Sequence, residues 1–334
     1  AVAEQLPPLL LCRDLHTIRA SKQIYRKGKC AAFFSRLSND RVRDILADAG
    51  WHRFRGKADQ LAAEVLNRGA DYTALKAVFN AMGYQHNREV FAAMFERFME
   101  YDPETRQRFP AALLWGESGL LPAPNAPELI PELRKFVDVC WRQWGRLQRS
   151  ARSPLPWRRH GQRPYHTPER RIAALIRLLE KLPLPVTGLL EFCDDSIAPA
   201  TAAEAMLQQL TCSDPCWDRH TGFYAPPSRK AVVLGRQQAL EITVNVILPI
   251  IYVYGRINLE AKDFSPAVIK IWEQLPPTQD NRIIKTATAA WFPDRDRREI
   301  MNSAATRQGI IHLYREYCHR CQSDCNSCLF YNSL

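Results

Sequence analysis

The sequence predicts a mainly α-helical protein, and three observations lead to this fold class. Apolar residues recur every three or four positions along most of the chain, a spacing that places them on one face of a helix. Several of these runs begin at Ser or Pro and stop at Gly, which are signals of helix boundaries. The composition, 46% hydrophobic and 24% charged, is that of a folded globular protein. We expect two helical lobes joined by a connector.

The first lobe is predicted at residues 30–121, after an extended N-terminal segment at 1–29. Its first helix has Ser38 as its N-cap and carries Val42 and Leu46 on one face. The helices expected in this lobe lie at 37–54, 56–68, 71–84, 91–101 and 109–121, the second and third ending at Gly69 and Gly83.

Residues 122–168 are rich in proline and arginine and predict an extended connector. Pro168 then stands in the first turn of the next helix, where its missing N–H costs nothing. A second helical lobe is predicted at 169–317, followed by a cysteine-rich tail at 318–334. Its helices are expected at 168–182, 200–210, 265–275, 281–292 and 302–318.

Residues 235–257 allow two interpretations. Their β-branched side chains favour a strand, whereas their length favours a helix kinked near Pro249. The uncharged run within them has 14 residues at 242–255, fewer than the ~20 of a membrane span, so we expect a buried core segment. Asn245 in this run must find a hydrogen-bond partner. Because the first ten residues also lack the basic segment of a signal peptide, a soluble cytoplasmic protein is expected.

The net charge of +11 is unevenly spread, since residues 142–171 hold nine arginines, no lysine and one acid, Glu169. Arginine forks match phosphate oxygens, and the aromatic residues Trp144, Trp157 and Tyr165 could stack on bases. The alternative is a linker whose arginines pair with acids elsewhere. The candidate nucleic-acid contacts are Arg152, Arg158, Arg159, Arg163, Arg170 and Arg171.

Four cysteines near the end of the chain, Cys318, Cys321, Cys325 and Cys328, form the pattern C-x2-C-x3-C-x2-C. Zinc and iron–sulfur clusters are held by converging thiolates or imidazoles, and paired cysteines commonly supply them. The short spacer makes a self-contained site cramped, so a set of three with Cys30 as the fourth ligand is the alternative. Disulfides are disfavoured because cytosolic thiols stay reduced. Either zinc or an iron–sulfur cluster is expected.

Enzyme signatures are otherwise missing, including phosphate-binding glycine loops, the nucleophile elbow and the zinc-protease motif. Arg307 and His312 form an R-x4-H pair on a predicted helix, which is similar to the active-site motif of helical ribonucleases of the HEPN type. In such a site the histidine is the acid/base and the arginine holds the phosphate. The motif is short, so a structural role for both residues is the stronger interpretation.

Several stretches together resemble the DUF 2851 family of uncharacterised bacterial proteins. They are HRFRGKA at 52–58, AMGYQHNRE at 81–89, ALLWGESGLLP at 112–122, RPYHTPERRIAAL at 163–175, LEITVNVILP at 240–249 and ATRQGIIHLYREYC at 305–318. Longer members begin with a segment that looks like the core of a PD-(D/E)XK nuclease, which holds a divalent metal through carboxylates. The resemblance implies that this chain follows such a segment and does not itself carry the nuclease core.

The resemblance also bears on the cysteines. The family tail usually retains three, matching Cys318, Cys325 and Cys328, whereas Cys321 looks like an addition. Some nucleases of that fold build a cluster from one early and three late cysteines, and by this analogy Cys30 or an upstream residue is the fourth ligand.

Two functions follow as hypotheses. The first is a helical accessory region that binds nucleic acid for a nuclease-like protein, with no enzymatic activity of its own. The alternative is a structural or protein-interaction scaffold with a structural metal site. Arginines in a continuous open groove would favour the first function, and arginines buried against carboxylates would favour the second.

Overall fold

The computed structural model describes residues 28–84, 86–147, 152–161, 164–257, 263–321 and 324–332. Within them the regular structure is helical and no β-strand occurs, which confirms the predicted fold class. An antiparallel bridge between Cys212 and Leu234 joins two loop segments.

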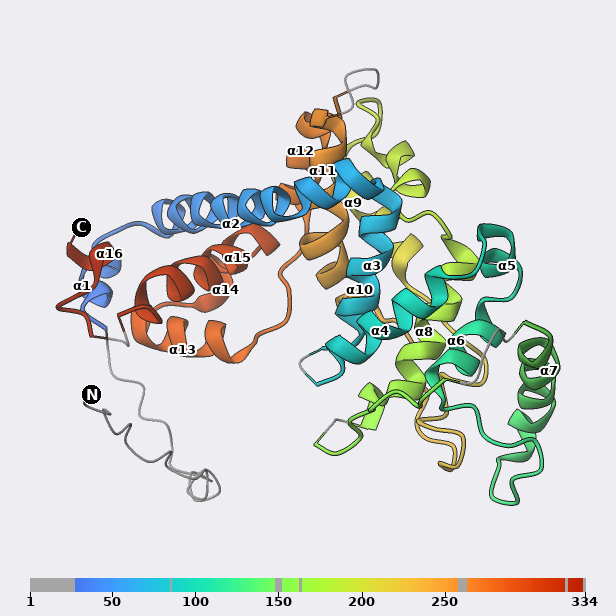
Figure 1. Ribbon diagram of the computed structural model, residues 1–334. Helices are drawn as coiled ribbons and strands as arrows, with labels where there is room; N and C mark the ends of the chain where they lie inside the picture. Colours follow the sequence, from blue (N-terminus) through green and yellow to red (C-terminus); the bar gives the residue numbers. More distant parts are fainter. Residues whose placement is uncertain are drawn as a thin grey trace, which may run out of the picture.

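Figure 1 shows the helices in chain order from blue to red. The first are α1 (Cys30–Ser35), α2 (Asn39–Arg68), α3 (Ala70–Met82), α4 (Arg88–Met99), α5 (Pro103–Arg108), α6 (Pro110–Ser118) and α7 (Pro131–Leu147). The middle ones are η2 (Pro164–His166), α8 (Pro168–Lys181), η3 (Thr187–Cys193), α9 (Pro199–Leu210), α10 (Arg236–Ile242), η4 (Thr243–Ile247) and α11 (Leu248–Ile257). The last are α12 (Ser265–Gln274), α13 (Arg282–Trp291), α14 (Arg297–Ile300), α15 (Ala304–Leu313), η5 (Tyr314–Cys318) and α16 (Leu329–Asn332).

Helix α2 is the longest element, with 30 residues. Its predicted boundaries are confirmed, since the Ser38 hydroxyl accepts the Arg41 N–H at 3.2 Å and Gly69 ends the helix with a φ of 87°. The helices expected at 37–54 and 56–68 form a single helix. Gly56 can continue it, because a Cβ at this position would have no neighbouring atom within 4 Å. Figure 1 shows that α2 passes from α1 to the region of α3 and α11.

Helix α7 lies inside the segment for which an extended connector was expected. Its residues Leu133, Val137, Cys140 and Trp144 are buried and follow a spacing of three or four, which is the spacing of one helical face. Pro131 begins the helix at a position where no N–H is required. The high proline content of the surrounding residues therefore concealed a helix of 17 residues.

The ambiguous stretch forms one continuous helix, α10–η4–α11, rather than a strand. Its middle part, η4, is a π-helix that contains Asn245 and ends shortly before Pro249. Proline lacks an N–H and its ring clashes with the carbonyl four residues earlier, and a π-segment relieves this conflict. By length and composition, Arg236–Ile257 is the one helix of the described residues that could cross a membrane, and most of it is buried inside the molecule.

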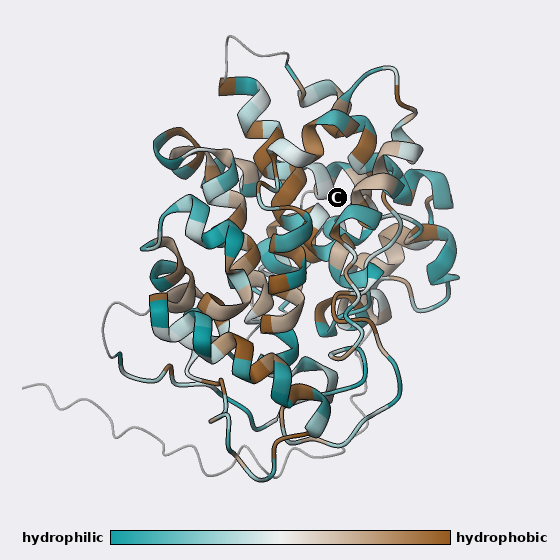
Figure 2. Ribbon diagram, turned by 90° about the vertical axis from the view of Figure 1, so that its right-hand side faces the viewer, coloured by the Kyte–Doolittle hydropathy of each residue, from teal (hydrophilic) through white to brown (hydrophobic). Residues whose placement is uncertain are grey.

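The buried side chains form two clusters. The larger extends from Phe54 to Leu275 and also includes Ala304 and Ala305. The smaller packs α1 and the first part of α2 against α13, α15 and the segment between them. Figure 2 shows hydrophobic segments on inward-facing parts of the helices and hydrophilic ones outside. Both predicted lobes contribute to each cluster, and the division of the chain into these lobes stays a prediction.

Candidate functional site

The aromatic residues of the arginine-rich segment have partners inside the protein. Trp144 is buried in the larger cluster. Trp157 donates its indole N–H to the Ser118 carbonyl at 2.7 Å, and Tyr165 donates its hydroxyl to the Arg229 carbonyl at 3.2 Å. These contacts fix the three rings within the fold, where Trp144 and Trp157 are not displayed as a platform for bases.

Arg170 and Arg171 are buried, each with 2% of its surface exposed. Arg170 donates to the backbone carbonyls of the 217–232 loop, including that of Ala231 at 2.6 Å. Arg171 donates to His166 Nδ1 at 2.9 Å and lies 4.4 Å from the ring centre of Tyr84. Burial lowers the pKa of both guanidinium groups. Both arginines therefore connect α8 to neighbouring segments.

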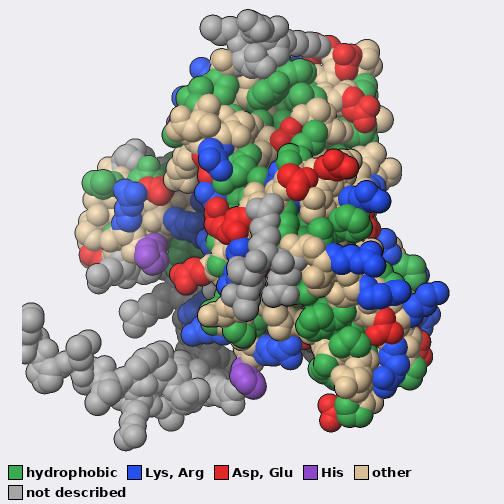
Figure 3. Space-filling view, turned by 45° about the vertical axis from the view of Figure 1, so that its right-hand side comes forward, with side chains coloured by type: hydrophobic (Ala, Val, Ile, Leu, Met, Phe, Trp, Pro, Cys, Tyr) green, Lys and Arg blue, Asp and Glu red, His purple; other side chains and the backbone are tan. Residues whose placement is uncertain are grey.

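The remaining candidate arginines are divided between ion pairs and the surface. Arg152 forms an ion pair with Glu100, which raises its pKa, and Arg159 pairs with the buried Glu169 at 2.6 Å. The Asn87 side chain accepts a hydrogen bond from the Arg158 N–H at 2.8 Å and donates one to the Arg158 carbonyl at 2.9 Å. Arg163 lies outside the described residues. Figure 3 shows Lys and Arg side chains mixed with acidic and hydrophobic ones on the face it displays.

Arg307 and His312 belong to separate environments. Arg307 pairs with Asp280 at 2.5 Å and also donates to the carbonyl of Thr278. His312 is half-buried, with its ring 6.3 Å from that of His52, and burial lowers its pKa. Residues five apart on a helix of 3.6 residues per turn point in directions roughly 140° apart. These positions do not form a joint acid/base and phosphate site.

The C-terminal cysteines lie beside Cys30 of α1. Cys30 and Cys328 are buried, and Cys318, Cys321 and Cys325 are half-buried. Burial is the main cause that raises the pKa of Cys30 to about 11, and the negative charges of the Cys328, Cys325 and Cys321 thiolates act in the same direction. Burial is also the main cause that raises the pKa of Cys318 to about 12, and the charge of Cys30 is the second cause. We call these five residues the cysteine cluster.

The packing around the cysteine cluster joins α1 to the tail. The Phe330 ring lies 6.3 Å from Phe34 and 5.3 Å from Tyr317. Lys29 donates to the Asn326 side chain and lies 5.5 Å from the ring centre of Tyr331. The chain therefore folds back after η5, so that α16 covers α1.

The cysteine cluster has the donor type that zinc and iron–sulfur clusters require. Among the described residues, however, no three Cys, His, Asp or Glu side chains converge as a metal-binding group.

A second polar group, absent from the sequence predictions except for Asn245, lies where α2 meets η4 and α15. The Lys57 ammonium donates to Asn245 Oδ1 and to Gln308 Oε1, the latter at 3.1 Å. Arg53 Nε donates to the same Gln308 oxygen at 2.8 Å. Asn245 donates in turn to the Glu241 carboxylate at 2.9 Å. The one signal in the sequence was an amide within an apolar run, which requires a polar partner.

Fold and site together define a class: an all-helical protein in which a cysteine-rich tail packs on the first described helix. The chain belongs to a family described as "Protein of unknown function (DUF2851)", whose model matches residues 4–281. Cys30 lies inside the matched residues, and the four cysteines of the tail follow them. A search of the curated proteins and a search of the solved structures found no match.

Proposed function

We propose that this chain is a structural scaffold whose smaller core is held closed by a zinc ion or an iron–sulfur cluster bound to the cysteine cluster. The observation that carries the proposal is that Cys30 of α1 lies in the smaller buried cluster and Cys318, close to the other end of the chain, packs against the same cluster. Such a centre would link the first described helix to the tail, as structural metals do in small cores.

Metal binding would change the protonation of these thiols. Burial and the repulsion between neighbouring thiolates raise the pKa of Cys30 and Cys318, so a metal would have to displace protons from these thiols on binding. A cation bound among them would stabilise the thiolates and neutralise the repulsion. Cys318, Cys325, Cys328 and Cys30 would be the ligands, with Cys321 as the remaining donor. Four thiolates leave no open position for a substrate, so the role would be structural.

Scaffolding is favoured over nucleic-acid binding by the arginines. Arg170 and Arg171 bind to segments of the same chain, and Arg152 and Arg159 pair with carboxylates. This is the arrangement expected for structural arginines. The partner of the scaffold would be the nuclease-like segment that the family resemblance implies, in a reducing compartment such as the cytoplasm that keeps thiols available for metal.

Anaerobic purification followed by elemental analysis and visible absorption spectroscopy tests the proposal. We expect close to one zinc ion, or the iron and sulfide of one cluster, per chain. Replacing Cys325 and Cys328 by Ser should remove the metal and lower the melting temperature.

The matched control makes the same replacement at Cys216, which is half-buried like Cys325, and at Cys140, which is buried like Cys328. Both control residues lie outside the cysteine cluster. This variant should keep the metal. Wild-type protein without metal, or equal metal loss in both variants, would contradict the proposal.

A further inference from the structure

The polar group around Lys57 contains cationic nitrogens that the protein leaves without partners. Arg53 uses Nε on Gln308, and its two Nη nitrogens have no hydrogen-bond partner among the described residues. Arg315, on the π-helix η5, is exposed and likewise has no hydrogen-bond or ion-pair partner in the described part of the chain. These guanidinium donors are not among the buried unpartnered atoms, so they are open to water or to a ligand.

Arg53, Lys57 and Arg315 lie close enough together for charge repulsion to lower the pKa of Arg53 and of Lys57. Burial is the main cause that lowers the pKa of Arg53 to about 10, and the charge of Arg315 is the second cause. Burial and the charge of Arg53 lower the pKa of Lys57 well below its usual range, and Arg315 acts in the same direction. The acids within reach are Glu241, at the solvent-facing edge, and Glu316, which is paired with Arg320 at 2.6 Å. When Lys57 is protonated, three cationic side chains therefore face two carboxylates.

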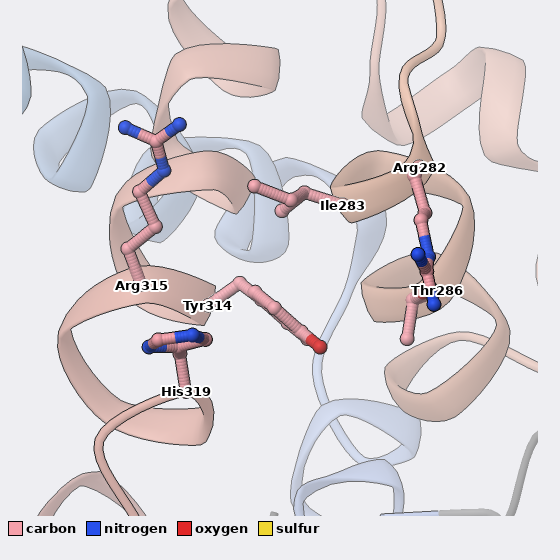
Figure 4. A pocket seen from close by; sticks show the side chains of 6 residues that line it. All are labelled: Arg282, Ile283, Thr286, Tyr314, Arg315 and His319. Atoms are coloured by element: carbon pink, nitrogen blue, oxygen red, sulfur yellow. The ribbon is translucent and has the colours of Figure 1, made fainter. Parts of the chain in front are cut away.

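A cavity of about 690 Å³ adjoins Arg315, between α13 and η5. It is lined by Arg282, Ile283, Thr286, Tyr314, Arg315 and His319. Figure 4 shows Tyr314 extending across the cavity toward α13, with Arg315 along its edge. The lining offers cations and hydroxyls and contains no carboxylate, a composition suited to an anionic molecule. Its volume is that of a small-ligand site, ~300–1,000 Å³.

We propose that Arg53, Lys57 and Arg315 bind the phosphate group of a small molecule whose remaining part lies in the cavity between α13 and η5. Guanidinium forks bind phosphate oxygens in pairs, and an ammonium adds a point charge. The π-helices η4 and η5 border this site and supply Asn245 and Arg315, and π-segments inside helices are frequent at functional sites.

Isothermal titration of the full chain with inorganic pyrophosphate, and separately with a nucleoside monophosphate, tests the proposal. We expect saturable binding that Arg53→Gln and Arg315→Gln each weaken by about tenfold or more, since each removes charge-assisted hydrogen bonds. Arg55→Gln is the matched control, because Arg55 is exposed on the same helix and two residues from Arg53, hence on another face. It should bind as the wild type does.

Binding should also take up a proton, because a bound anion raises the pKa of Lys57 from its lowered value. The groups facing Lys57 are Arg53, Glu241, Asn245, Gln308 and Arg315. The affinity should therefore fall as the pH rises through the pKa of Lys57, and Lys57→Met should abolish this dependence. Folded wild-type protein that binds neither probe would overturn the proposal. So would equal weakening by Arg55→Gln, or binding of an oligonucleotide that pyrophosphate does not displace.

Discussion

At the scale of residues, the arginines show that a basic segment in a sequence does not reveal what each of its side chains contacts. Arg170 and Arg158 stand in the same basic segment, yet Arg170 is 2% exposed and Arg158 lies on the surface. The guanidinium of Arg170 gathers backbone carbonyls from Trp217, His220, Ala231 and Val232. It organises a loop that has no regular secondary structure of its own.

Arg170→Ala should therefore destabilise the protein by about 3 kcal/mol, because it leaves several buried carbonyls without a donor. Arg170→Lys should recover little of this loss, since one ammonium cannot reproduce the planar fork. Arg158→Ala should change stability by less than ~0.5 kcal/mol. Urea denaturation measures all three. Equal, small effects for Arg170→Ala and Arg158→Ala would show that the loop does not depend on Arg170.

The sequence revealed which residues were candidates but not their surroundings. The cysteines and arginines were visible from composition and spacing, as was the need of Asn245 for a partner. Burial of Arg170 depends on a loop some 50 residues later in the chain, and Asn245 accepts its hydrogen bond from Lys57, which lies 188 residues earlier. Such long-range contacts leave no local periodicity, and the polar group around Lys57 was missed for that reason.

At the scale of elements, the crossing of α2 and α15 places Arg53 and Lys57 against Gln308. The two helices approach closely at Gly50 and Gly309. A Cβ on Gly309 would lie 1.8 Å from the Leu46 carbonyl oxygen, and one on Gly50 would lie 2.2 Å from that of Ala305. The absence of side chains at this contact allows the backbones to meet.

Gly309→Ala should accordingly destabilise the protein by about 3 kcal/mol or more, because the helices must separate to admit the methyl group. Gly56→Ala in α2 meets no atom within 4 Å and should stabilise the helix by ~0.5–1 kcal/mol. Thermal and urea denaturation of the two variants compare them directly. A stabilising effect at both positions would mean that the crossing is looser than described.

Most helices were predicted with the correct type because their apolar spacing and caps are local properties. Ser38, Gly69 and Pro168 occupy the boundary positions expected of them. Helix α7 was not expected, since the prolines around it dominated the interpretation of that segment. The strand-or-helix ambiguity at 235–257 arose because a helix buried on nearly all sides has no polar face to reveal its period.

At the scale of the whole molecule, the division into two buried clusters gives the cysteine cluster its importance. The larger cluster includes α8 and draws on most of the central chain, whereas the smaller joins α1 and the first part of α2 to α13 and α15, with Phe330 and Tyr331 of the tail packed against it. Short terminal segments fray unless they are held by further contacts. A metal bound by Cys30 and the tail cysteines would hold both segments at once.

Hydrogen exchange measured by mass spectrometry, before and after removal of metal by a chelator under reducing, anaerobic conditions, tests this claim most directly. We predict that metal removal increases exchange in residues 28–37 and 314–332, while α8 in the larger cluster keeps its protection. Exchange in 28–37 and 314–332 that is unchanged by the chelator, or protein from which no metal is released, would contradict the account.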